Sequence, residues 1–537
     1  MPCQHLPFIP DPHEEADMKH GRLLTSALAL TAFGAISAQA QTTLVIGIQS
    51  DPTGFDPEAI LNNTSGFVMS TVYDSLVKYK RGTVEVEPGL AQSWKISPDG
   101  KTYTFTLRKG VTFQDGTPFN AQTFVKSLDR LFKKNDSAYI YNTGPVESYI
   151  DFTYGPMDSY QATGPYTVQF KLKKPFAPFL TSLAMVWNGV VSPAAAAKFG
   201  KDFRNNPVGT GPFVFKEWVR GDHVTLAANP NYWGGKPKVD RLIFKVIPDP
   251  QAAVLALKRG EVQILADVSN QTIPAIRADP NLRLLTQPGL TISGVSLPFN
   301  VKPFSDVRVR QALNYAIDKD ALNRTLYQGL AKTLTSPLPE AQWGFDPSLK
   351  GYPYDPQKAK QLLTAAGYPN GFTAELLAYN TARGYNPAGP QLAIAIQGYL
   401  KQIGVNVNVK QMEFGSFLST VRSGKYGGMA LTGWSGDNGD PDNFLYELFA
   451  SPNIPVGNTS GYKNPKVDAL LQQAQFSTDR NQRVKLYQQA QRQIMQDAPW
   501  IFVNSTLQVR AARKEVQGLT LNPTQMFLDM QDVSLTK

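Results

Sequence analysis

The segment Phe372–Leu431 constrains the fold most, because its pattern alternates between strand and helix. Phe372–Tyr379 has the composition of a strand, and Pro390–Ile403 has helical spacing and stops at Gly404. Val405–Val409 then places a valine at every second position, as in a further strand. Such a βαβ unit implies parallel strands joined by a right-handed crossover. We therefore expect an open α/β sheet that gathers ligands at the carboxyl ends of its strands.

Two loops leave those strand ends with opposite charges. Arg383 follows the first strand, and Asp437 follows a strand predicted at Gly428–Thr432. We expect both side chains to face one crevice. The second loop, Gly433–Phe444, holds three carboxylates, three glycines and Trp434 within twelve residues. This composition is typical of a cation-binding loop.

The residues of this loop leave several interpretations open. Asp440 and Asp442 lie among turn signals, so we expect them to shape a solvated turn. A carboxylate pair could instead serve as acid and base, as in glycoside hydrolysis. Calcium fits less well, because Gly439 and Pro441 interrupt the alternating oxygen ligands of a calcium loop.

Other reactive groups are scarce. After residue 40 the sequence contains one histidine, His223, in a strand-like alternating segment where a structural role is the commoner one. The sequence has no cysteine nucleophile after residue 40, no Gly-x-Ser-x-Gly elbow, no phosphate-binding Gly-x-x-x-x-Gly-Lys-Ser/Thr loop and no paired histidine or cysteine metal spacing. We therefore predict a binding protein without cofactor or metal rather than an enzyme.

A small zwitterion suits the two charged loops. A dipeptide separates its ammonium and carboxylate by at most about 7 Å. We expect Asp437 to pair with the ammonium and Arg383 with the carboxylate, while Trp434 supplies an apolar wall. Both ligand charges need partners, because an unpaired charge taken out of water is costly. From composition alone, a solvated loop arginine remains the alternative for Arg383.

The amino-terminal residues predict export. Residues 18–40 combine a charged start, an apolar run and the small-x-small site Ala38–Ala40, which is the pattern of a cleaved signal peptide. Residues 1–17, with Cys3, then form an upstream extension, and Met18 is the preferred start. The position after the predicted cleavage site is Gln41 rather than a lipidated cysteine. We expect a free periplasmic protein.

Charge and length restrict the class of protein further. The 53 basic and 43 acidic residues give a net charge of +10, but they are spread along the chain without runs, so we expect no nucleic-acid partner. The length predicts two to four domains.

Strands are expected at Thr43–Ile48 and Thr102–Leu107, and helices are expected after Asp306 and from Pro356 to Gly367.

Several motifs resemble the large solute-binding proteins of peptide ABC importers, the family 5 extracellular solute-binding proteins. The matching segments, which run through most of the chain, are Pro88–Trp94, Ser97–Tyr103, Gly209–Phe213, Asn229–Gly234, Val307–Leu313 and Tyr354–Pro356. The resemblance implies an α/β, two-lobed, three-domain fold with a ligand cleft between the lobes. It also implies a monomer that delivers its ligand to permease subunits in the inner membrane.

Two local matches point to the dipeptide-binding branch of this family. Trp434–Phe444 resembles the branch's loop, whose first aspartate, here Asp437, takes the peptide ammonium. Arg383–Pro387 resembles the segment whose arginine takes the C-terminal carboxylate, with glycine in place of the usual proline at the second position. A threonine contact of the family falls near Leu61 and Asn62. The ligand-binding residues implied are Asn62, Arg383, Gly384, Tyr385, Trp434, Ser435, Gly436 and Asp437.

The resemblance also implies domain boundaries. Residues 41–82, 205–298 and 508–537 would form domain I, residues 83–204 domain II, and residues 299–507 domain III. Domain III would supply both charged anchors. The same fold could carry another ligand, such as a longer peptide, haem or a peptide-like compound.

Overall fold

The computed structural model describes residues 41–60, 62–140 and 150–536. The predicted signal peptide, residues 18–40, and the extension before it, residues 1–17, lie outside these ranges, as does Leu61. No helix within the described ranges has the length and apolar character needed to cross a bilayer.

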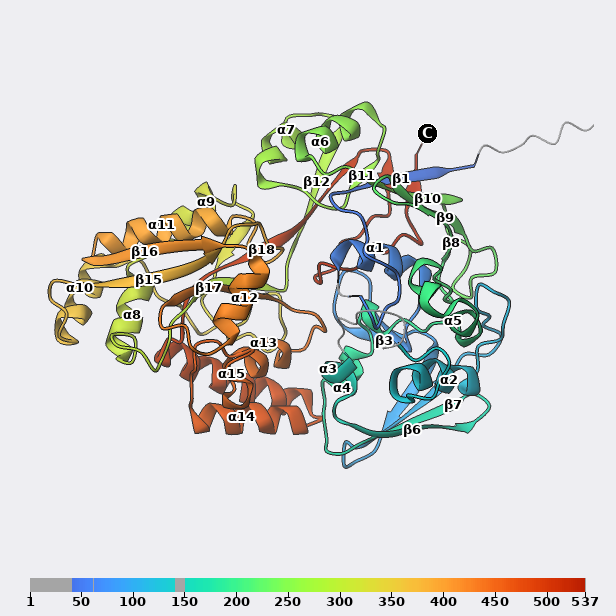
Figure 1. The fold of residues 1–537 in the computed structure, drawn as a ribbon, viewed down its shortest axis with the longest axis horizontal. Helices are drawn as coiled ribbons and strands as arrows, with labels where there is room; N and C mark the ends of the chain where they lie inside the picture. Colours follow the sequence, from blue (N-terminus) through green and yellow to red (C-terminus); the bar gives the residue numbers. More distant parts are fainter. Residues whose placement is uncertain (1–40, 61, 141–149, 537) are drawn as a thin grey trace, which may run out of the picture. The chain divides into compact units, whose positions relative to one another are not determined.

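A twelve-stranded sheet organises most of the chain (Figure 1). Its strand order is β16-β15-β17-β13-β18-β11-β1-β10-β9-β8, and β12 and β14 also pair with β18. The strands are β1 (Thr43–Ile48), β8 (Phe213–Val219), β9 (His223–Ala228), β10 (Arg241–Val246), β11 (Ile264–Leu265), β12 (Leu282–Pro288), β13 (Thr291–Ser296), β14 (Ala331–Thr333), β15 (Phe372–Tyr379), β16 (Val405–Met412), β17 (Met429–Ser435) and β18 (Trp500–Arg513).

Smaller sheets and the helices complete the fold. An antiparallel sheet has the order β4-β5-β7-β6, and two further pairs are β2-β3 and β19-β20. These strands are β2 (Val77–Tyr79), β3 (Val86–Pro88), β4 (Ala91–Ile96), β5 (Thr102–Leu107), β6 (Met157–Gly164), β7 (Thr167–Leu172), β19 (Val516–Gln517) and β20 (Ser534–Leu535). The α-helices are α1 (Asn63–Val72), α2 (Ala121–Phe132), α3 (Ile150–Tyr154), α4 (Phe179–Ser182), α5 (Pro193–Phe199), α6 (Pro250–Arg259), α7 (Ile273–Arg277), α8 (Val307–Tyr315), α9 (Lys319–Thr325), α10 (Pro356–Ala365), α11 (Gly389–Lys401), α12 (Phe414–Arg422), α13 (Asp442–Phe449), α14 (Pro465–Phe476) and α15 (Arg480–Asp497).

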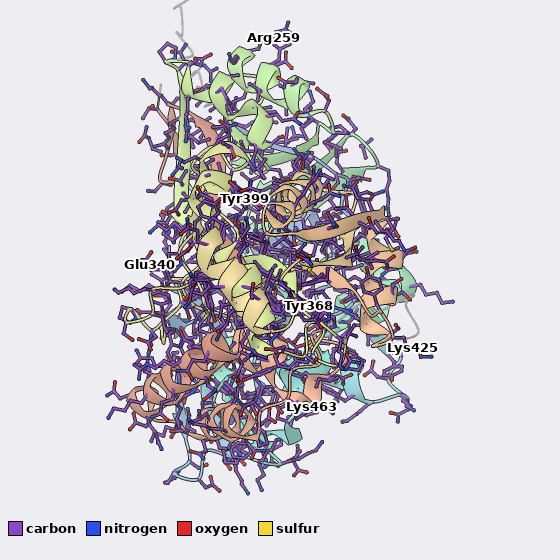
Figure 2. The ribbon with its side chains drawn as sticks, turned by 90° about the vertical axis from the view of Figure 1, so that its left-hand side faces the viewer. Arg259, Glu340, Tyr368, Tyr399, Lys425 and Lys463 are labelled. Carbon is purple, nitrogen blue, oxygen red and sulfur yellow. The ribbon has the colours of Figure 1, made fainter. Side chains whose placement is uncertain are left out.

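The predicted βαβ unit is confirmed. β15 and β16 pair in parallel along their full length, and β17 joins β15 in parallel at Leu376 and Leu377. Helix α11 packs on β15 and β16, and Gly404 ends the connection with a φ of 84°. Tyr399, which Figure 2 labels, lies on α11. Its ring meets the Tyr354 ring edge to face, with 5.8 Å between the ring centroids. The carboxyl ends of three neighbouring strands therefore lie at one edge.

Other predicted elements are also confirmed, with small shifts. β1 and β5 have the predicted bounds, and α8 begins after Asp306, whose side chain accepts a hydrogen bond from the Arg308 N–H. α10 begins at Pro356 and ends before Gly367, which has a φ of 91°. β17 extends three residues beyond the predicted end at Thr432. Trp434 and Ser435 therefore belong to a strand rather than to the loop.

One long strand joins the two halves of the large sheet. The first part of β18, up to Thr506, pairs with β13 and β14, and the part from Leu507 onward pairs with β12 and β11. Separate apolar cores form around β1 and α1, around β15 and α11, and around β5 and α2. The α/β class predicted from the sequence is confirmed, while the domain boundaries stay predictions.

Candidate ligand-binding site

Arg383 sits in a turn that its neighbours hold rigidly. The backbones of Arg383 and Asn386 exchange two hydrogen bonds, of 3.1 and 2.9 Å. The fully buried Asn386 side chain accepts a 2.7 Å hydrogen bond from the Tyr327 hydroxyl and donates a 3.0 Å bond to Tyr379 Oη. The loop after β15 therefore presents Arg383 from a fixed base.

The Arg383 guanidinium lacks an acidic partner among the described residues. Its Cζ lies 3.6 Å from the centroid of the Phe414 ring, and its buried Nε has no hydrogen-bond acceptor. No described carboxylate lies within 4.0 Å of it. Burial raises the pKa of the neighbouring Tyr385 hydroxyl, and the Arg383 charge opposes that rise. A guanidinium without a carboxylate partner is suited to bind an anionic group of a ligand.

Tyr385 connects the Arg383 turn to β17. Its ring lies so close to the Gly433 backbone that a Cβ at Gly433 would collide with it. Gly384 is equally tight on its other side, because a Cβ there would collide with the Gln525 side chain, whose Nε2 donates a 2.7 Å hydrogen bond to Gly384 O. A larger residue at this position would require the end of the Gln525 side chain to move.

Asn443 orients the residues at the end of β17. The Asn443 Oδ1 atom accepts hydrogen bonds from Trp434 Nε1 and from the Asp437 N–H, both of 3.0 Å. The Gly436 N–H donates a 2.6 Å bond to Leu290 O, and a Cβ at Gly436 would stand 2.6 Å from the Phe444 ring. Trp434 and Ser435 are half-buried, whereas Gly436 and Asp437 are buried.

Asp437 is 7% exposed and lies in an acidic, buried environment. Burial raises the pKa of the Tyr79 hydroxyl well above its usual range, and the charges of Asp437 and Asp440 raise it further. Tyr79, on β2, donates a 3.1 Å hydrogen bond to Thr181 O. The carboxylate therefore stands close to residues from the amino-terminal part of the chain.

The other two carboxylates of the loop, those of Asp440 and Asp442, are not solvated, so the prediction that they lie in a solvated turn is wrong. Asp440 is fully buried and accepts bonds of 2.9 and 2.7 Å from the Arg483 guanidinium, and Asp442 is 5% exposed. Burial, helped by the charge of Asp440, raises the pKa of Asp442 to about 8. The predicted turn-shaping role is confirmed, because Asp440 Oδ1 accepts from the Asp442 N–H at 3.0 Å. Arg483, 43 residues away, gave no local signal in the sequence.

The loop also packs against the amino-terminal half of the chain. Asn438 Nδ2 donates a 3.0 Å hydrogen bond to Ser182 Oγ. Gly439 has a φ of 66°, and a Cβ there would collide with Val84. Gly439 O accepts hydrogen bonds of 2.7 and 3.0 Å from the side chains of Gln342 and Trp343. The loop is thus fixed from both sides.

Asn62 is half-buried, and its side chain has a structural role. Its side-chain oxygen caps α1 by accepting a 3.1 Å hydrogen bond from the Ser65 N–H. Its neighbour Asn63, rather than Asn62, lines the cavity that contains Arg383. The side-chain oxygen of Asn62 is therefore committed to the helix.

A cavity of about 590 Å³ opens beside Arg383. Arg383 and Gly384 line it together with Asn63, Phe67, Gln508 and Arg510. Asp437, Trp434 and Ser435 are not among its lining residues, so this cavity does not bring Arg383 and Asp437 together as expected. The two candidate segments meet instead where Tyr385 packs on Gly433. The sequence did not predict a role for Gln508 and Arg510, because no local pattern of residues connects them to Arg383.

Nothing in the described part of the chain resembles a metal centre, since no group of three or more histidine, cysteine or acidic side chains has a suitable arrangement there. His223 begins β9, and its ring lies 2.8 Å from Asp222 and 3.5 Å from Glu217. This position agrees with the strand predicted around His223.

Comparisons with known proteins give a consistent result. The chain is 35% identical to the dipeptide-binding protein of Escherichia coli over 94% of this chain and 97% of that one. It is 36% identical to heme-binding protein A of Haemophilus influenzae over 93% of each chain. The structure resembles the periplasmic binding protein DppA of Helicobacter pylori in complex with the peptide STSA, with a TM-score of 0.77, 33% identity and coverage of 93% of this chain and 99% of that one.

The family model for bacterial extracellular solute-binding proteins, family 5, matches residues 85–455. This match and the structural neighbours confirm both the resemblance inferred from the sequence and the two-lobed α/β architecture it implied. The relatives reported above are binding proteins. The chain belongs to the bacterial extracellular solute-binding proteins of family 5.

Proposed function

We propose that this protein binds dipeptides or short peptides by their charged termini and delivers them to the permease of an ABC importer. The observation that carries the proposal is the state of Arg383. It lines a cavity of about 590 Å³, its Nε is buried without an acceptor, and no described carboxylate lies within 4.0 Å of it. A ligand carboxylate would supply the missing charge, and it would also supply the missing acceptor once the side chain rotates, because neighbouring atoms cover Nε.

The opposite end of the ligand belongs to Asp437 in this proposal. Asp437 follows the carboxyl end of β17, and Tyr385 packs on Gly433 of the same strand, so the anchor segments are neighbours. A dipeptide spans about 7 Å between its charged groups. Pairing at both ends favours a zwitterion over a singly charged ligand, because an unpaired charge is costly to bury.

The remaining candidate residues would shape the site around these anchors. Trp434 is oriented by its hydrogen bond to Asn443 and offers an apolar wall to a ligand side chain. The peptide backbone of the ligand would form hydrogen bonds with Ser435, Gly436 and Gly384. Such contacts do not select among ligand side chains. Asn62 would contact the ligand from the amino-terminal end of α1, because its side-chain oxygen already caps that helix.

The named relatives support a peptide or peptide-like ligand and keep one alternative open. One is named as a dipeptide-binding protein, another as a heme-binding protein, and the structural neighbour holds a tetrapeptide. A hydrolase is disfavoured by the loop itself. Asp440 is neutralised by Arg483, and Asp442 is buried, so neither is placed as an exposed acid or base.

Membership of family 5 supports a proposal for the cellular context of this protein. Family 5 consists of extracellular solute-binding proteins. We infer that this chain is exported through its signal peptide, acts as a monomer in the periplasm, and docks on inner-membrane permease subunits. Ligand contacts to both lobes would favour the closed conformation, because only differential contacts can shift such an equilibrium.

Mass spectrometry of ligand released from freshly purified protein tests the proposal. We expect a short peptide, and we expect titration calorimetry to show that Ala-Ala binds whereas N-acetyl-Ala-Ala amide does not. Recovery of intact dipeptide after long incubation is expected of a binding protein. Hydrolysis of the dipeptide, or equal affinity for the capped compound, would refute the proposal.

A further inference from the structure

The cavity beside Arg383 continues onto β18, the strand that joins the two halves of the sheet. Gln508 and Arg510 line it there, and Phe67 of α1 and Asp267 line it from the amino-terminal half. At about 590 Å³ it lies within the range of pockets that enclose drug-sized ligands. A group that extends past the carboxylate held by Arg383 would therefore meet these residues.

Arg510 is buried without an ion pair. It is 8% exposed, and its Nη1 and Nη2 each donate a 3.0 Å hydrogen bond to backbone oxygens, those of Val509 and Gln525. Its Nε is buried and has no acceptor, and its Cζ stands 5.2 Å from the centroid of the Phe67 ring. No described carboxylate lies within 4.0 Å of it. Burial lowers the pKa of Arg510, while the more distant charge of Asp267 opposes that change.

Gln508 presents a second unsatisfied donor beside it. Gln508 is 4% exposed, and its buried Nε2 has no acceptor. Residues two apart on a strand project to the same face, so Gln508 and Arg510 point the same way from β18. With Arg383, three residues that line one cavity each carry a buried N–H group without an acceptor.

The charge of this cavity favours an anion. Its charged lining residues within the described ranges are Arg383, Arg510 and Asp267, which leave a net positive charge when all three are ionised. Buried donors without acceptors are unfavourable, so ligand oxygens that accept from them would be strongly favoured. The unpaired nitrogens are covered by neighbouring atoms, and the side chains must therefore rotate to reach a ligand.

We propose that Arg510 and Gln508 form a second anion subsite, which receives the side-chain carboxylate of an acidic C-terminal residue while Arg383 holds the α-carboxylate. The inference rests on the proposed function and narrows its ligand class. Short peptides that end in aspartate or glutamate would be preferred over otherwise identical peptides that end in the neutral amides.

Titration calorimetry of the full exported chain with Ala-Ala, Ala-Gln and Ala-Glu tests this subsite. Ala-Glu and Ala-Gln have nearly the same shape and differ in charge. We expect wild-type protein to bind Ala-Glu about tenfold more tightly than Ala-Gln, because hydrogen bonds to a charged group are stronger than neutral ones. This wild-type comparison needs no variant. Equal affinities would overturn the inference while leaving the proposed function standing.

Two variants then locate the preference. Arg510→Gln should abolish the preference for Ala-Glu and leave Ala-Ala binding within about twofold. Arg513→Gln is the matched control, since Arg513 lies on the same strand but outside the cavity and pairs with Glu515. It should keep the wild-type preference. A preference that survives in Arg510→Gln would overturn the assignment, and failure of all three dipeptides to bind would refute the proposed function together with the subsite.

Discussion

Removing the Arg383 side chain should cost most of the affinity that a dipeptide gains from its C-terminal carboxylate. Arg383 is half-buried, stacks on Phe414 at 3.6 Å and has no described carboxylate within 4.0 Å. Two unit charges 4 Å apart interact by about 4 kcal/mol at an effective dielectric constant of 20. Leaving one member of a buried pair unpaired costs about 2 to 5 kcal/mol. We therefore expect Arg383→Ala to weaken Ala-Ala binding by about 3 kcal/mol, or more than 100-fold.

The assay is titration calorimetry with Ala-Ala and with its C-terminal amide, on wild-type protein and on Arg383→Ala. In wild-type protein the amide should bind much more weakly than the free acid. In the variant the two ligands should bind almost equally, because the partner of the carboxylate is gone. Arg259→Ala is the control, since the Arg259 side chain is 63% exposed, and it should change neither affinity. An amide penalty of the same size in Arg383→Ala would refute the role assigned to Arg383.

Four further changes test the loop and its surroundings. Asp437→Asn should weaken binding of Ala-Ala by about 2 to 5 kcal/mol but leave N-acetyl-Ala-Ala unaffected; calorimetry showing equal losses for both ligands would contradict the ammonium contact. Asp440→Asn should lower the free energy of unfolding by about 3 to 5 kcal/mol in urea titrations, because it breaks a buried ion pair, and an unchanged unfolding midpoint would argue against this pair. Burial raises the pKa of Asp442 to about 8 from its ordinary 3.8, so its contribution to stability is complete below about pH 4 and is lost as the pH rises through 8. Asp442→Asn should accordingly become more stable relative to wild type between pH 5 and pH 9 in thermal melts, and a pH-independent difference would contradict the raised pKa. Gly439→Ala should destabilise the protein by more than about 1 kcal/mol and by more than Gly461→Ala, because both glycines have positive φ but only the first would collide with a neighbour.

Local sequence determined the helices and strands around the candidate site and the charges of the two proposed anchors, Arg383 and Asp437. Strand alternation and helical spacing between Phe372 and Val409 were enough to predict β15, α11 and β16, because those patterns follow from backbone geometry over a few residues. Parallel pairing then followed from the order of strand and helix. The placement of Arg383 and Asp437 after strand ends required nothing more.

Tertiary structure decided the environment of each charge. The three carboxylates of the loop look alike in sequence, yet Asp440 pairs with Arg483 from α15, whereas Asp442 is buried and forms no ion pair among the described residues. Gln508 and Arg510 join Arg383 in one cavity although more than a hundred residues separate them from it. Burial and charge pairing depend on contacts between distant segments, and a local pattern carries no information about those contacts. The sequence by itself therefore indicated the two charged groups of the proposed zwitterion site, Arg383 and Asp437, and only the packing of the chain decided what surrounds each of them.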